Sequence, residues 1–211
     1  MIRSALYRSV SVLLWAILIS SCSDGAFKAP TAPVDALAAK SAGASDKGPS
    51  LGRLPSAQGN VELKALWWKK KHDINGVAVS RQIGPSGGTI ELPANGLTIV
   101  FPAGALKDTK TITVTPDDKY VAYKMEPSGT TFDQDVTVTQ LLSFTEMAGT
   151  PLRTQLYAAY IRDDNAKLSG KVTVSTTDLQ VSHTVMSLLT GLPEAEVWVI
   201  RHFSRYMLSS G

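Results

Sequence analysis

The stretch that decides the fold class runs from Ile83 to Phe132 and reads IGPSGGTIELPANGLTIVFPAGALKDTKTITVTPDDKYVAYKMEPSGTTF. In the run LTIVF (97–101), apolar side chains recur at every second position, which places Leu97 and Phe101 on one face of an extended chain. The dipeptide Asn95-Gly96 precedes this run and suits the positive φ angles of a tight β-hairpin turn. The stretch therefore predicts a succession of short antiparallel strands.

The same pattern continues outward on both sides. Short runs bounded by glycine, proline or Asp/Asn clusters predict strands at residues 77–83, 89–92, 97–101, 111–115, 120–125, 136–144, 156–162, 171–175, 196–200 and 203–208. The run LQVSHTVMSLL (179–189) stays open between a strand and a short helix, and its first half favours a strand. Strands this short, with turns this regular, are typical of an all-β fold, and of an antiparallel β-sandwich more than a barrel. We expect its core to contain Ile90, Leu92, Leu97, Ile99, Phe101, Val114, Phe132, Val136, Val138, Tyr157, Val174, Val199 and Phe203.

The N-terminus resembles the signal of a bacterial lipoprotein. Arg3 and Arg8 precede an apolar run, VSVLLWAILI (10–19), that is too short for a permanent membrane span. Small residues then lead to Cys22, the only cysteine in the chain. The resemblance implies that Cys22 is lipidated and anchors the protein to a membrane of the cell envelope. Ser23, in place of aspartate, favours the outer membrane if the organism is Gram-negative.

Cys22 has two alternative interpretations. An ordinary cleaved secretory signal would leave a free thiol in an oxidising compartment, and an uncleaved membrane anchor would need a longer apolar run. Three segments follow from the lipoprotein interpretation: a signal peptide at 1–21, a lipid-anchored flexible linker at 22–60, and a β-sandwich domain at 61–211. The linker assignment rests on a composition rich in Ala, Ser, Gly and Pro with no sustained periodicity.

Charge and cysteine content narrow the classes of function. The net charge of +3 falls to about +1 once Arg3 and Arg8 are removed, which is too weak to favour nucleic acid as a partner. With no cysteine after Cys22, the domain holds no internal disulfide and no thiolate metal site. His72 and His183 lack partners at metal-ligand spacing, so no metal or other cofactor is expected.

A family resemblance accompanies these features. The pair Gly87-Gly88, the run FPAGAL (101–106) and the run MEPSGTTF (125–132) resemble the ZU5 domain of ankyrins, netrin receptors and death-domain proteins. The residues around them are similar to those of ZU5-like bacterial lipoproteins. The resemblance implies a ZU5-like β-sandwich that serves as a non-enzymatic interaction or structural module.

The most specific chemical hypothesis concerns the His-Phe-Ser sequence at residues 202–204. Some ZU5-containing proteins and certain nucleoporins cleave themselves between the Phe and Ser of such a sequence. Residues two apart in a strand share a face, so His202 would accept the hydroxyl proton of Ser204, whose oxygen would attack the Phe203 carbonyl. The resulting ester would be hydrolysed by water. The alternative is a packing role, with Phe203 in the core and no reaction.

A third interpretation is a carbohydrate-binding module. Trp67 and Trp68 are adjacent, so in a strand one would pack inward while the other faces solvent and contacts a sugar or a protein. The partners that the sequence predicts are thus a membrane, through the lipid on Cys22, and a protein or polysaccharide.

Overall fold

The computed structural model describes residues 59–70 and 77–211, and within them the regular structure consists of β-strands and two short 3-10 turns. The strands are β1 (Asn60–Ala65), β2 (Val79–Ile83), β3 (Gly88–Leu92), β4 (Leu97–Phe101), β5 (Lys110–Pro116), β6 (Ala122–Glu126), β7 (Thr131–Leu141), β8 (Leu156–Ile161), β9 (Lys171–Ser175), β10 (Ser182–Met186), β11 (Pro193–His202) and β12 (Arg205–Ser210). None of the helical turns in this part of the chain is long and apolar enough to cross a bilayer.

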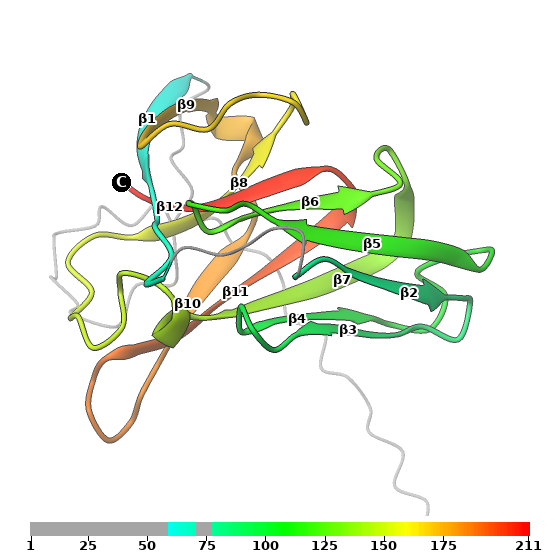
Figure 1. Cartoon of the computed structure of the whole chain (residues 1–211), viewed down its shortest axis with the longest axis horizontal. Helices are drawn as coiled ribbons and strands as arrows, with labels where there is room; N and C mark the ends of the chain where they lie inside the picture. Colours follow the sequence, from blue (N-terminus) through cyan, green and yellow to red (C-terminus); the bar gives the residue numbers. More distant parts are fainter. Residues whose placement is uncertain (1–58, 71–76) are drawn as a thin grey trace, which may run out of the picture. The chain divides into compact units, whose positions relative to one another are not determined.

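The strands form two antiparallel sheets, as Figure 1 shows. The 7-stranded sheet has the order β2-β5-β6-β12-β1-β9, with β8 paired to β12, and the 5-stranded sheet has the order β10-β11-β7-β4-β3. The main apolar cluster combines side chains of both sheets, such as Ile99 of β4 and Val114 of β5. The prediction of an all-β, sandwich-like domain of antiparallel strands is therefore confirmed.

The hairpin of β3 and β4 forms as its sequence predicts. Leu92 pairs with Leu97 across the turn Pro93–Gly96, and Gly96 adopts a φ of 67°. A Cβ atom at Gly96 would lie 2.4 Å from Cδ2 of Phe144, so both the backbone angle and the close packing require glycine.

The core comprises two clusters. Ten of the thirteen expected core residues lie in the main cluster between the sheets: Ile90, Leu92, Leu97, Ile99, Phe101, Val114, Phe132, Val136, Val138 and Phe203. Val174 is buried in a second cluster, and Tyr157 is only partly buried against that cluster. The expectation for Val199 is wrong, because its neighbours Trp198 and Ile200 face the core and Val199 is half-buried on the opposite face of β11.

Several boundaries differ from the predicted ones. β1 was not predicted, and the strand expected over 136–144 begins at Thr131 and ends at Leu141, before a 3-10 turn. The open stretch 179–189 contains strand β10. The predicted signal peptide, Cys22 and the predicted linker up to residue 58 lie outside the described residues, as does His72.

Candidate functional site

The Phe203–Ser204 peptide carries the chain from one sheet to the other. β11 ends at His202 in the 5-stranded sheet, and β12 begins at Arg205 in the 7-stranded sheet. The strand predicted over 203–208 therefore begins at Arg205. The alternation that would bring His202 and Ser204 to one face is interrupted at this crossing.

The backbone of this peptide is held on both sides. The Phe203 amide donates to the Thr130 carbonyl over 2.7 Å, and the Gly129 amide donates to the Phe203 carbonyl over 3.0 Å. The Phe203 ring packs edge-on against Phe132, with 4.7 Å between the ring centroids, and is fully buried. A carbonyl that accepts an amide hydrogen bond is polarised toward the charge that a nucleophilic attack would place on its oxygen.

The hydroxyl of Ser204 meets a carboxylate from another loop. Ser204 Oγ donates to Asp164 Oδ1 over 2.9 Å, and Asp164 lies between β8 and β9. Burial alone would raise the pKa of Asp164, but hydrogen bonds from Ser128 and Ser204 and the charges of Lys124 and Arg205 outweigh it and lower that pKa. Asp164 is therefore an anion that accepts hydrogen bonds at neutral pH, and a poor proton acceptor for catalysis.

The side chain of His202 contacts tyrosines. Its ring lies edge-on to Tyr160, with 4.8 Å between centroids, and its Nδ1 is 3.3 Å from the Tyr206 hydroxyl. That hydroxyl also donates to the His202 carbonyl over 2.8 Å, and burial raises the pKa of Tyr206. The structure thus places Asp164 at the Ser204 hydroxyl, and it places His202 against Tyr160 and Tyr206.

The two tryptophans differ in burial. Trp68 is buried, and its Nε1 donates to the Asp117 carbonyl over 2.8 Å. Trp67 is 37% exposed, but the ammonium of Lys119 lies 4.4 Å from its ring centroid and Tyr120 packs edge-on against it. A sugar ring that stacked on Trp67 would compete with Lys119.

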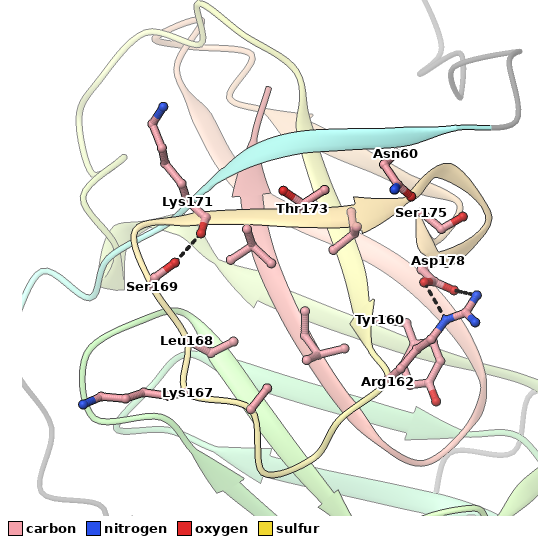
Figure 2. Close-up of a pocket in the computed structure, with 14 residues that line it drawn as sticks. Asn60, Tyr160, Arg162, Lys167, Leu168, Ser169, Lys171, Thr173, Ser175 and Asp178 are labelled. Carbon is pink, nitrogen blue, oxygen red and sulfur yellow. Dashed lines mark hydrogen bonds and ion pairs between the residues drawn. The ribbon is translucent and has the colours of Figure 1, made fainter.

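A pocket of about 620 Å³ opens beside β9, as Figure 2 shows. Arg162 and Asp178 form a two-fold hydrogen-bonded ion pair at 2.9 and 3.0 Å, and Lys171 pairs with Glu62 at 2.8 Å. These partners already satisfy two of the cations that line the pocket, so those cations do not converge on a ligand.

The exposed apolar side chains gather elsewhere. Trp67 aside, every large hydrophobic residue exposed within the described ranges lies on the 5-stranded sheet or its β10–β11 hairpin, namely Val100, Leu141, Val181, Val185, Met186, Leu188 and Leu189. The register explains why they face outward. Ile99, Val138 and Trp198 pair across the inner face, so Val100 and its neighbours point to the other side.

The outer face of this sheet is aliphatic in its centre. The side chains that we call the apolar face are Val100, Thr137, Thr139, Leu141, Val181, Val185, Ala195, Val197 and Val199, and the polar residues Thr98 and His183 lie in the same rows. Charge appears at its margin, where Arg201 pairs with Asp135 at 2.6 Å. A solvent-facing sheet surface is ordinarily polar at alternate positions, so the apolar face is unusually rich in aliphatic side chains for such a surface.

The tip of the β10–β11 hairpin adds the two most exposed side chains. Leu188 and Leu189 are 102% and 97% exposed, respectively. The loop is nevertheless well ordered by its own hydrogen bonds, since Ser187 N donates to the Leu192 carbonyl over 2.8 Å and Gly191 N donates to the Ser187 carbonyl over 2.9 Å. The two leucines are therefore presented by a fixed turn.

Comparison with known proteins adds no assignment: no protein-family model matches the chain, and no curated protein is significantly similar to it. The geometry described above carries the functional argument alone.

Sequence reasoning missed the residues that matter most here. Nothing in the sequence around Asp164 connects it to Ser204, which lies 40 residues further along the chain. Leu188 and Leu189 stood in a stretch interpreted as a strand or short helix, where consecutive leucines suggest burial. The signal available was the pair Thr190-Gly191 directly after them, which is typical of a turn.

Proposed function

We propose that this protein is a lipid-anchored bacterial envelope protein whose ZU5-like β-sandwich is a non-enzymatic interaction module. The observation that carries the proposal is the concentration of exposed aliphatic side chains on the apolar face and the hairpin tip. Water disfavours such a surface, and its burial against a partner is favourable at about 25 cal/mol per Å² of apolar area.

The chemistry of this surface favours a protein over a polysaccharide. Sugar-binding surfaces stack pyranose rings on aromatic side chains, whereas the apolar face is built of valine, leucine, alanine and threonine. The ring face of Trp67, the aromatic candidate, already contacts the ammonium group of Lys119. The anchor and the envelope location rest on Arg3, Arg8, the apolar run and Cys22.

Two measurements test this function. Labelled palmitate should enter the full chain and should fail to enter the Cys22→Ser variant. A photo-cross-linking residue at Leu189 should yield covalent adducts in intact cells, whereas the same residue at Arg81, which is exposed on the other sheet, should yield few. Equal labelling of the Cys22→Ser protein would refute the anchor, and an adduct yield at Leu189 no higher than at Arg81 would refute the interaction surface.

Self-cleavage between Phe203 and Ser204 is the second candidate, and the Gly129 amide favours it. This amide donates to the carbonyl that would be attacked. In that reaction Ser204 Oγ bonds to the Phe203 carbonyl carbon, the peptide C–N bond breaks, and the Ser204 nitrogen takes up the hydroxyl proton. Water then hydrolyses the ester to a Phe203 carboxylate and restores the hydroxyl.

A further inference from the structure

The loop that joins β10 to β11 projects from its sheet and ends in exposed leucines. In Figure 1 this loop (orange) extends beyond the ends of the other strands of the 5-stranded sheet. Leu188 and Leu189 are fully exposed there, and Met186 at the end of β10 is exposed as well. The apolar surface at this place is therefore a projecting tip, in contrast to the flat apolar face.

The hairpin contains no formally charged residue. Residues 179–193 include no lysine, arginine, aspartate or glutamate, and His183 is their one ionisable side chain. The flanking charged residues are Asp178, which is paired with Arg162 at 2.9 Å, and Glu194. A segment without charge can pass from water toward hydrocarbon without the large cost of desolvating an ion. The hairpin therefore meets one requirement for entry into a lipid bilayer.

The backbone of the turn meets a second requirement, because its polar groups bond to one another. The Gly191 amide donates to the Ser187 carbonyl over 2.9 Å, and the Ser187 amide donates to the Leu192 carbonyl over 2.8 Å. The Leu192 amide donates to the Thr190 hydroxyl over 3.3 Å. Hydrocarbon offers no hydrogen-bond partners, so a segment that satisfies its own amides enters a bilayer at lower cost. The hydroxyls of Ser187 and Thr190 suit a shallow position near the lipid head groups.

The length of chain before the described residues indicates which surface the tip meets. Residues 23–58 separate Gly59, the first described residue, from the lipid anchor proposed at Cys22. A segment of that length spans at most about 120 Å, so the anchored domain stays within reach of the bilayer that holds the anchor. Such confinement raises the effective concentration of the bilayer for every weak contact that the domain makes with it. The leucines therefore act at a surface that the anchor has already brought close.

We propose that the hairpin tip inserts Leu188 and Leu189 into the bilayer that carries the lipid anchor. The proposal rests on the anchored interaction role proposed above and deepens it, because it assigns the tip to lipid and leaves the apolar face to a protein partner. A projecting apolar turn needs a matching pocket on a protein, whereas a fluid bilayer adapts to its shape. Insertion at this second point would fix the orientation of the domain relative to the membrane.

Spin labelling of the full, lipidated chain in phosphatidylcholine vesicles tests the insertion. A nitroxide is attached at Leu189→Cys, and the same label at Arg81→Cys on β2 is the control on the other sheet. Oxygen concentrates in hydrocarbon and a nickel chelate stays in water, so collisions of the nitroxide with each reagent report its depth. The ratio of oxygen to nickel accessibility should be at least about fivefold higher at Leu189 than at Arg81.

A matched pair of leucines tests whether the tip drives the insertion. With the label at Leu189→Cys, Leu188→Ser should lower the equilibrium constant for insertion about tenfold or more, because one buried leucine is lost. Leu141→Ser makes the same change at an exposed leucine of the apolar face and should leave that constant within about twofold. Added phosphatidylglycerol or salt should also leave it within about twofold, because the hairpin holds no formal charge.

The outcomes separate this proposal from the function on which it rests. Equal accessibility at Leu189 and Arg81, equal effects of Leu188→Ser and Leu141→Ser, or an insertion that requires phosphatidylglycerol would overturn the insertion of the tip. A wild-type chain that takes up the thiol-reactive label at Cys22 would instead refute the anchor. In intact cells, the photo-cross-linking residue at Leu189 should yield adducts with the mass of a phospholipid. Protein adducts at that position would overturn the bilayer as occupant and support the interaction role.

Discussion

Ser204 Oγ and Asp164 Oδ1 lie 2.9 Å apart, and this hydrogen bond joins the crossing between the two sheets to the loop between β8 and β9. The carboxylate fixes the serine hydroxyl in one orientation. That orientation points the hydroxyl proton at an anion whose pKa is lowered, so the bond stabilises the crossing and does little to activate the oxygen.

We therefore expect the folded protein to keep a single intact mass after prolonged incubation. Denaturing mass spectrometry of the purified chain measures this directly. Loss of residues 204–211 that Ser204→Ala prevents would instead establish self-cleavage. In that case His202→Ala would slow the reaction if the imidazole is the base, and Asp164→Asn would slow it if the carboxylate is.

Phe101 lies within a trio of edge-on rings, with 5.8 Å to the centroid of Phe132 and 5.9 Å to that of Phe203. Phe101→Ala should lower the free energy of unfolding by about 3–5 kcal/mol, because the neighbouring rings cannot fill the cavity. Urea unfolding measures the loss. Val100→Ala, on the opposite face of the same strand, should cost much less, and equal losses would show that Phe101 is not the buried member of the pair.

The ion pair between Arg205 and Asp117 is largely shielded from water, with side chains 12% and 17% exposed and 2.9 Å between Nη2 and Oδ2. Asp117 also accepts hydrogen bonds from the amides of Lys119 and Tyr120. Asp117→Ala should therefore destabilise the fold by about 3 kcal/mol, since it leaves a partly buried guanidinium without its partner.

The exposed pair of Arg201 and Asp135 provides the matched control for that measurement. Its side chains are 78% and 48% exposed, so Asp135→Ala should cost less than about 1 kcal/mol in the same urea experiment. A loss at Asp117 no larger than at Asp135 would contradict the role assigned to the buried pair.

Glu196 is a buried carboxyl on the inner face of the 5-stranded sheet. Thr184 donates to its Oε2 over 2.6 Å, and no hydrogen-bond partner for its Oε1 is found among the described residues. Burial raises the pKa of Glu196 above its ordinary value, so the folded state holds the proton more tightly than the unfolded chain does.

The stabilisation by this protonated carboxyl is complete below the unfolded-state pKa and is lost as pH rises through the folded-state pKa. Glu196→Gln should remove that decline, with a higher free energy of unfolding than wild type at about pH 8 and a similar one at about pH 4. Urea titrations at both values measure it. Glu194 is exposed on the same strand, so Glu194→Gln should change the free energy of unfolding at neither pH. If the free energy of unfolding of Glu196→Gln still declines as pH rises, another group causes the decline.

The strands that could be predicted from the sequence are those with one buried face. In β3 and β4, strict alternation and the Asn95-Gly96 turn fix both the hairpin and the inward side chains. β11 is apolar on both faces, with Val197 and Val199 alternating with Trp198 and Ile200, so periodicity shows the strand but not which side is inward.

The site depends on contacts that sequence patterns do not reveal. Asp164 meets Ser204 and Asp117 meets Arg205 only because β12 inserts beside β6 and β8. His202 and Ser204 share a face only while the strand continues, and the change of sheet at Phe203 ends that relationship. Local spacing therefore predicted a reactive pair where the tertiary structure formed different ones.

The position of β12 also constrains the order of folding during synthesis. β12 pairs with β6, β1 and β8, so these three strands have no shared neighbour until residues 205–210 have left the ribosome. Pairing of Ala65 with Ser209 closes a loop that spans nearly the whole domain, and such distant contacts slow folding. Until then β6 and β1 each have one strand partner, β5 and β9, while β8 lacks its strand partner, so this sheet stays incomplete in the nascent chain and exposes strand edges that favour aggregation.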